Sequence, residues 1–79
     1  MVNEAIKDIV INLIKENIPI PNIEIKDSTT LKEDLEFDSL DEIDLLINIE
    51  GRFKISIPDS ELDNVKTISD MVTLISKYI

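Results

Sequence analysis

The spacing of apolar residues predicts a first helix over residues 3–17. Asn3 is a suitable N-cap, and Glu4 places a negative charge in the first helical turn. Pro19 and Pro21 then end the pattern, because proline lacks a backbone N–H and pushes the preceding residue toward extended geometry. The apolar side chains that recur with the i, i+3, i+4 rhythm of an amphipathic helix are Ile6, Ile9, Val10, Leu13 and Ile14.

The chain between these prolines and Asp38 shows no helical period. The alternation of Ile18 with Ile20 and of Ile23 with Ile25 permits a strand, but the prolines and the lack of a hairpin signal favour a loop. A loop of about 20 residues is uncommon in a compact domain and is usually functional. Its aliphatic residues are predicted to anchor it to a core: Ile20, Ile23, Ile25, Leu31 and Leu35.

A second helix is predicted from Ser39 to Arg52, with Asp38 or Ser39 as its cap. Its apolar residues form two stripes on a helical wheel, where one is enough to face a small core. A central helix buried on two sides would explain both stripes. The carboxylates of Asp44 and Glu50 border the second stripe, however, and burial of unpaired charges is costly, so a partner-binding face is favoured. The core stripe comprises Leu45, Leu46, Ile49 and Phe53; the second stripe comprises Leu40, Ile43 and Ile47.

Two further elements follow. Pro58 opens a short helical turn from Asp59 to about Asp63, and a last helix begins at Thr67 and runs to the C-terminus. Asp70, three residues after Thr67, forms a variant of the capping box. The apolar residues of the last helix are Ile68, Met71, Val72, Ile75 and Tyr78. Residues 1–79 are therefore predicted to form a single all-α domain with three longer helices, one short helix and a long loop between the first two.

The amino-acid composition excludes several classes of function. The 79 residues include no cysteine and no histidine, which removes the thiol nucleophile, the zinc–thiolate site, the disulfide and the usual general base. The formal net charge is −9, and residues 33–50, with eight acids and no base, contribute −8 of it. This charge disfavours nucleic acid and anionic membranes and favours basic protein surfaces. The sequence shows neither a membrane-spanning apolar run nor a secretory signal, which predicts a cytoplasmic protein without stable membrane insertion.

Ser39 stands where the long loop meets the second predicted helix. Catalysis by its hydroxyl would need a base, and the chain has no histidine to serve as one. A helix N-terminus presents free N–H groups and a positive dipole end, so a phosphate esterified to Ser39 would be favoured there. Asp38 and Asp41 would oppose a tight phosphate site, which favours an exposed attachment. Position alone leaves both the cap and the attachment point open.

The acidic segment also resembles part of a calcium loop. Asp34, Glu36 and Asp38 have the first, third and fifth spacing of an EF-hand. The sixth position is Ser39 where that loop needs glycine, and the twelfth is Leu45 where it needs glutamate. We therefore predict no specific metal site.

The run Asp38-Ser39-Leu40-Asp41, followed by Ile43-Asp44-Leu45-Leu46, resembles the signature of acyl carrier proteins. The resemblance implies a four-helix bundle without catalytic activity of its own. It also implies that Ser39, flanked by Asp38 and Leu40, carries a 4′-phosphopantetheine arm that is transferred from coenzyme A and holds acyl groups as thioesters. Similar positions extend over essentially the whole chain: Leu35, Phe53, Ile57-Pro58-Asp59, Val65, Thr67, Ile75 and Tyr78.

The resemblance also implies partners and roles. The expected partners of a monomeric carrier are a phosphopantetheinyl transferase and the basic-surfaced acyl synthases and transferases of fatty acid or polyketide-type biosynthesis. A thiol supplied by the arm would fit a chain without cysteine. Two departures from many relatives are Glu36, where they have glycine, and Gly51, whose place inside a helix costs about 1 kcal/mol relative to alanine. The implied partner-binding residues are Asp41, Ile43, Asp44, Ile47 and Glu50, and those implied to shelter the acyl chain are Leu45, Leu46, Ile49 and Phe53.

Overall fold

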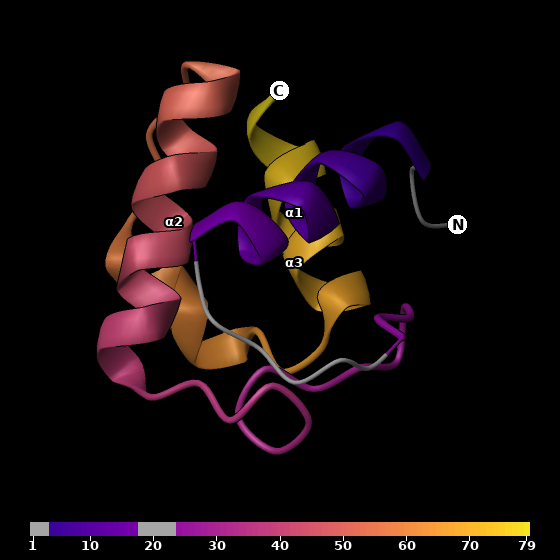
Figure 1. The fold of residues 1–79 in the computed structure, drawn as a ribbon. Coiled ribbons are helices and arrows are strands. Elements are labelled where there is room, and N and C mark those ends of the chain that lie inside the picture. The colour runs from indigo at the N-terminus through magenta and orange to yellow at the C-terminus, as the bar shows by residue number, and fades with distance from the viewer. Residues whose placement is uncertain (1–3, 18–23) are drawn as a thin grey trace.

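The first helix packs against both of the other long helices. The computed structural model describes residues 4–17 and 24–79. Figure 1 shows the first helix crossing in front of the last one, with the second helix standing beside them. Within the described residues the regular elements are helical, as the sequence predicts. In chain order they are α1 (Glu4–Asn17), α2 (Ser39–Phe53), the 3₁₀ helix η1 (Asp59–Asn64), which packs against α2, and α3 (Ile68–Tyr78).

The start of α3 has the capping box that the sequence predicts. The backbone N–H of Asp70 donates to the Thr67 hydroxyl at 3.1 Å, and the Asp70 carboxylate accepts from the Thr67 N–H at 3.1 Å. A further bond from the Lys66 N–H (3.0 Å) to the same carboxylate is the main reason why the pKa of Asp70 lies below its ordinary value. The predicted cap of the first helix, Asn3, lies outside the described residues.

The core draws its buried residues from the three α-helices and the segments between them, and η1 adds only half-buried Leu62 at its edge. The stripe of α2 predicted to face the core is buried, because Leu45, Leu46 and Ile49 are each 0% exposed and Phe53 packs against them from a half-buried position. Phe37, from the loop, is also buried, although no periodic pattern marked it. The buried apolar residues are Ile6, Val10, Ile14, Leu31, Leu35, Phe37, Leu45, Leu46, Ile49, Ile57, Val65, Ile68, Met71, Val72, Leu74 and Ile75.

The long loop is held by backbone hydrogen bonds to the approach to α3. Thr30 and Thr67 form an antiparallel bridge. Beside it, the Leu31 N–H donates to the Lys66 carbonyl at 2.9 Å, and the Thr29 carbonyl accepts from the Ile68 N–H at 3.0 Å. The loop assignment is therefore correct for residues 24–38, whereas this pairing was not predicted. Of the predicted anchors, Leu31 and Leu35 are buried and Ile25 is half-buried; Ile20 and Ile23, with Ile18 and the prolines Pro19 and Pro21, lie outside the described residues.

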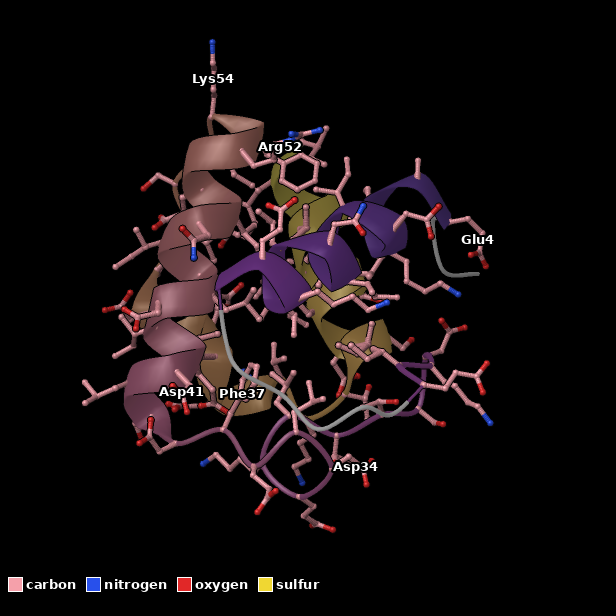
Figure 2. The ribbon with its side chains drawn as sticks, in the orientation of Figure 1. Glu4, Asp34, Phe37, Asp41, Arg52 and Lys54 are labelled. Atoms are coloured by element: carbon pink, nitrogen blue, oxygen red, sulfur yellow. The ribbon has the colours of Figure 1, made fainter. Side chains whose placement is uncertain are left out.

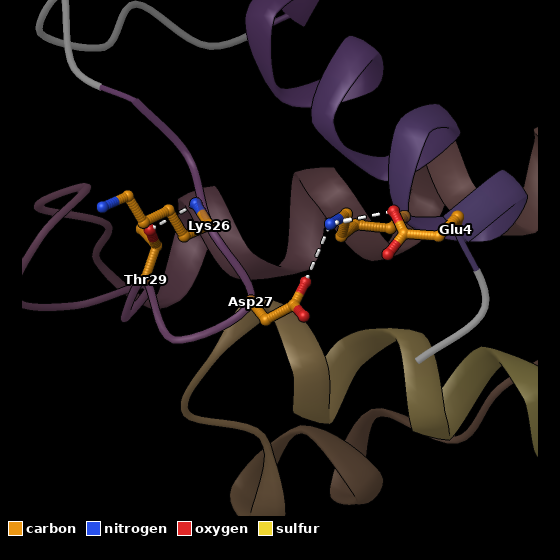
Figure 3. Close-up of polar contacts among 5 residues, drawn as sticks. Glu4, Lys26, Asp27 and Thr29 are labelled. Atoms are coloured by element: carbon orange, nitrogen blue, oxygen red, sulfur yellow. Dashed lines mark hydrogen bonds and ion pairs between the residues drawn. The ribbon is translucent and has the colours of Figure 1, made fainter. Parts of the chain in front are cut away.

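An ion pair joins the same loop to α1. The Lys7 ammonium lies 3.0 Å from a carboxylate oxygen of Glu4 and 3.0 Å from one of Asp27. Figure 3 shows Glu4 on α1 and Asp27 on the loop facing it. The contact with Glu4, followed by that with Asp27, raises the pKa of Lys7 above its ordinary value. The Asp27 carbonyl also accepts from the Ser69 N–H at 2.9 Å. Asp27 therefore connects the loop to two helices at once.

The Glu61 carboxylate fixes η1 to the end of α3. It accepts hydrogen bonds from the Lys77 ammonium and from the Tyr78 hydroxyl, both at 3.2 Å. These bonds, that from Lys77 first, hold the pKa of Glu61 below its ordinary value. Because η1 is too short to be stable alone, such contacts with its neighbours are what hold it in place.

Gly51 lies inside α2, as predicted, and is the basis of a first test. It is exposed, and a Cβ built at this position would meet nothing within 4 Å. The Gly51→Ala variant should therefore keep its contacts while losing the backbone entropy penalty of glycine. We expect urea denaturation at neutral pH to show a free energy of unfolding higher by about 0.5–1 kcal/mol. A variant no more stable than the parent would contradict a regular helix at this position.

Candidate functional site

The start of α2 is capped by Asp38, which decides between the two caps that the sequence allowed. Asp38 is extended (φ −98°, ψ −175°), and its carboxylate accepts from the Asp41 N–H at 2.9 Å. The Asp41 carboxylate in turn accepts from the Asp38 N–H at 3.1 Å. Ser39, the first residue of α2, is exposed and lies outside these reciprocal bonds. Its hydroxyl is therefore available for another role.

The segment before Ser39 is held by the loop itself. The backbone N–H of Thr30 donates to the Asp34 carboxylate (2.9 Å), and the Asp34 N–H donates to the Thr30 hydroxyl (3.0 Å). The N–H of Phe37 donates to the Leu31 carbonyl at 2.9 Å, and its ring is 4% exposed. Figure 2 shows Phe37 between the loop that carries Asp34 and the first turn of α2, where Asp41 lies. A buried ring one residue before the cap thus fixes where Ser39 emerges.

Glu36 adopts a backbone conformation that favours glycine. Its φ is 58°, in the left-handed region. A side chain there costs roughly 1–2 kcal/mol, and glycine avoids the cost. The turn that leads into Ser39 therefore forms although a glutamate, and not a glycine, occupies its left-handed position.

A pocket of about 400 Å³ lies beside Ser39. The loop, α2 and η1 each supply part of its wall. Five of its lining side chains are charged, and the apolar ones are few. The lining residues are Thr30, Lys32, Glu33, Ser39, Glu42, Leu62, Asp63, Val65 and Lys66. The residues implied to shelter an acyl chain, Leu45, Leu46, Ile49 and Phe53, belong to the core rather than to this wall.

Glu42 is a member of this wall whose burial the sequence did not indicate. It is one of the eight acids of residues 33–50, yet it is only 8% exposed. Burial raises the pKa of its carboxyl, a neighbouring Lys32 lowers it, and Asp38 raises it further. The spacing could have suggested that Glu42 lies beside Ser39, because residues three apart share a helix face and Glu42 follows Ser39 by three.

The second stripe of α2 is exposed at both ends. Leu40 is 71% exposed and Ile47 is 58% exposed, whereas Ile43 is half-buried. Asp44 is exposed beside them. This rules out the alternative in which the helix is buried on both sides. Exposed large apolar side chains with an acid between them are typical of a protein-binding surface.

Glu50, predicted to border the second stripe, has a structural contact. Its carboxylate accepts from the Ile57 N–H at 2.8 Å, and the side chain is half-buried. It therefore supports the segment between α2 and η1, where Lys54 also adopts a left-handed conformation (φ 58°) and ends α2. Figure 2 shows Lys54 at the opposite end of α2 from Asp41.

Over residues 4–17 and 24–79, no three acidic side chains gather closely enough to hold a metal ion. Over the same residues, no helix has both the length and the apolar character needed to cross a bilayer.

The fold and the exposed serine define a class, the phosphopantetheine-bearing carrier domains. The family model described as "Phosphopantetheine attachment site" matches residues 8–75. An acyl carrier protein of Phytoplasma australiense is 39% identical over 79 residues, covering 100% of this chain and 99% of that protein. One of Helicobacter hepaticus is 36% identical over 72 residues, covering 91% and 90%.

A solved structure supports the same assignment. The crystal structure of an acyl carrier protein from Thermotoga maritima superposes with a TM-score of 0.81 at 26% identity, covering 94% of this chain and 86% of that one. The chain belongs to the acyl carrier protein family, a family of carriers that bear phosphopantetheine.

Proposed function

We propose that this protein carries acyl groups as thioesters on a 4′-phosphopantetheine arm attached to Ser39. The observation that carries the proposal is the cap of α2: Asp38 occupies it, so the exposed Ser39 hydroxyl is left for attachment. The pocket beside Ser39 gives an arm a place to lie. In the loading step the Ser39 oxygen forms a bond to the pantetheine phosphorus of coenzyme A, adenosine 3′,5′-bisphosphate leaves, and the hydroxyl proton passes to the transferase.

The test is intact mass spectrometry. The purified chain, incubated with coenzyme A and a phosphopantetheinyl transferase, should gain the mass of one phosphopantetheine group. No gain with several transferases would contradict the proposal. It would then favour an acidic domain that docks through α2 without modification, the other class of function that the charge of this segment allows.

We further propose that separate enzymes of fatty acid or polyketide-type biosynthesis act on the cargo and dock on the second stripe. Support comes from Leu40 and Ile47, both exposed, and from Asp44 beside them. Asp41 and Ile43 continue the same face from half-buried positions. Charge complementarity with a basic partner would chiefly accelerate association. The cytoplasmic location and the monomeric state stay predictions from sequence.

The Ile47→Asp variant tests this face. It should slow acyl transfer between the loaded carrier and a partner enzyme by about tenfold or more, because a charge would replace an apolar contact. Its melting temperature should stay near that of the parent, since Ile47 is outside the core. Asp44→Lys should slow the association of the carrier with a basic partner enzyme, and this difference from the parent should disappear at high salt.

The matched control adds the same charge elsewhere. Asn12 is an exposed residue of α1, and Asn12→Asp should leave the transfer rate unchanged. Equal rates for Ile47→Asp and Asn12→Asp would place the docking surface away from α2.

A further inference from the structure

Glu42 is a buried carboxylate that the carrier role leaves without an explanation. It is 8% exposed and faces the pocket that holds Ser39. Within the described residues no hydrogen bond or ion pair engages its side chain, whereas other acids of the same segment are bound: Asp34 to the Thr30 N–H, Asp41 to the Asp38 N–H and Glu50 to the Ile57 N–H. The carboxylate oxygens of Glu42 reach the solvent in this pocket, so a ligand that displaces this solvent must supply a hydrogen-bond donor in its place.

The charges around the pocket do not supply that donor. Lys32 is near enough to lower the pKa of Glu42, but it is exposed and forms no ion pair of 4.0 Å or less with it. Lys66 lines the same pocket from the approach to α3, and its side chain is exposed. The remaining charged groups that face the pocket or the carboxyl are acids: Glu33 of the loop, Asp38 at the cap and Asp63 of η1. Acids raise the energy of an ionised Glu42 and cannot donate to it when ionised.

The phosphopantetheine arm carries donors of the required kind. It has two amide N–H groups and one free hydroxyl, and a pocket of about 400 Å³ lies within the usual size range of small-molecule sites. Ser39 and Glu42 lie one helical turn apart on α2 and line the same pocket, so Glu42 is within reach of an arm attached to Ser39.

We propose that Glu42 is a positioning residue for the prosthetic arm, accepting a hydrogen bond from an amide or hydroxyl of pantetheine and so holding the arm in the pocket beside Ser39. This inference rests on the proposed attachment at Ser39. Attachment of the arm to Ser39 does not itself require a carboxylate at position 42.

The proposal predicts the direction in which attachment of the arm changes the pKa of Glu42. Without the arm, burial holds the pKa of Glu42 above its ordinary value of 4.5. Between that value and the raised pKa, the folded state retains a proton that the unfolded state has lost. The free energy of unfolding therefore falls as pH rises through this range. A donor to the carboxylate favours its ionised form and lowers the pKa. The phosphodiester charge alone would raise it. The direction of the change therefore separates a hydrogen bond from mere proximity of the phosphate.

The experiment is a pH titration of the Glu42 carboxyl by ¹³C NMR, in the protein before and after loading. We expect a pKa lower by about 1 pH unit in the loaded protein. Hydrogen exchange of the arm amides supplies a second readout. It should be about tenfold faster in the loaded Glu42→Leu variant, which keeps the volume but removes the acceptor, and near the parent rate in Glu42→Gln, which keeps a carbonyl acceptor. Asp8→Asn removes an exposed charge of α1, away from this pocket, and should leave the exchange rate unchanged.

Intact mass separates the two proposals. A chain that takes up no arm would overturn both of them. A fully loaded chain in which the pKa of Glu42 is unchanged or raised, or in which Glu42→Leu exchanges like the parent, would overturn this inference and leave the attachment at Ser39 standing.

Discussion

The Ser39→Ala variant is expected to gain no mass when it is incubated with coenzyme A and a phosphopantetheinyl transferase, under conditions that load the parent chain completely. The effect is all or none, because the substitution removes the only oxygen at this position that can form the phosphodiester. The protein should otherwise stay intact, since the cap of α2 is formed by Asp38 and Asp41 and Ser39 is exposed. Its free energy of unfolding should lie within about 0.5 kcal/mol of the parent value.

Ser60 provides the matched control. It is an exposed serine in the short 3₁₀ helix η1. Ser60→Ala should load like the parent. Loading of Ser39→Ala, or failure of Ser60→Ala to load while folded, would move the attachment point away from the start of α2.

The second large effect concerns stability, and α2 offers two isoleucines for it. Ile49 is 0% exposed and Ile47 is 58% exposed. Ile49→Ala should lower the free energy of unfolding by about 2–5 kcal/mol, because it removes buried methyl groups and leaves a cavity. Ile47→Ala should change it by less than about 0.5 kcal/mol. In a domain of this size, whose total stability is at the low end of about 5–15 kcal/mol, the first loss brings the chain close to unfolding.

Urea denaturation followed by circular dichroism measures both variants. The pair is informative because residue type, helix and removed atoms are the same, so only burial differs. Similar losses for the two variants would show that α2 is buried on both sides, and would remove the exposed face on which partner docking depends.

Local sequence was sufficient for the helix starts. Thr67 with Asp70, and Asp38 with Asp41, are capping pairs three residues apart, so the interactions that begin each helix lie within one turn of chain. The sequence alone left Asp38 and Ser39 both open as the cap of α2. The C-terminal end of α2 was predicted almost as well, since the helix extends to Phe53, one residue beyond the predicted end at Arg52. The two stripes of α2 likewise follow from helical periodicity, and the stripe predicted to face the core is the buried one.

Phe37, Glu42 and Glu50 were beyond the reach of such patterns. Phe37 lies in a loop, where no period marks a buried position. Glu50 bonds to the Ile57 N–H across a turn that ends in left-handed Lys54, so its environment depends on how the chain leaves α2. Glu42 has the residue type of a solvated acid, but it is only 8% exposed and lines a pocket to which the loop and η1 also contribute.

The sequence by itself therefore determined the helical class, the element order, the capped start of α2 with Ser39 on it, and the split of its apolar residues into two stripes. These features depend on residues within a few positions of one another. Only the tertiary structure decided that Thr30 pairs with Thr67, that Glu42 is enclosed and that a pocket forms beside Ser39. Burial is a property of segments brought together from different parts of the chain, and the charge on a side chain does not reveal which neighbours will cover it.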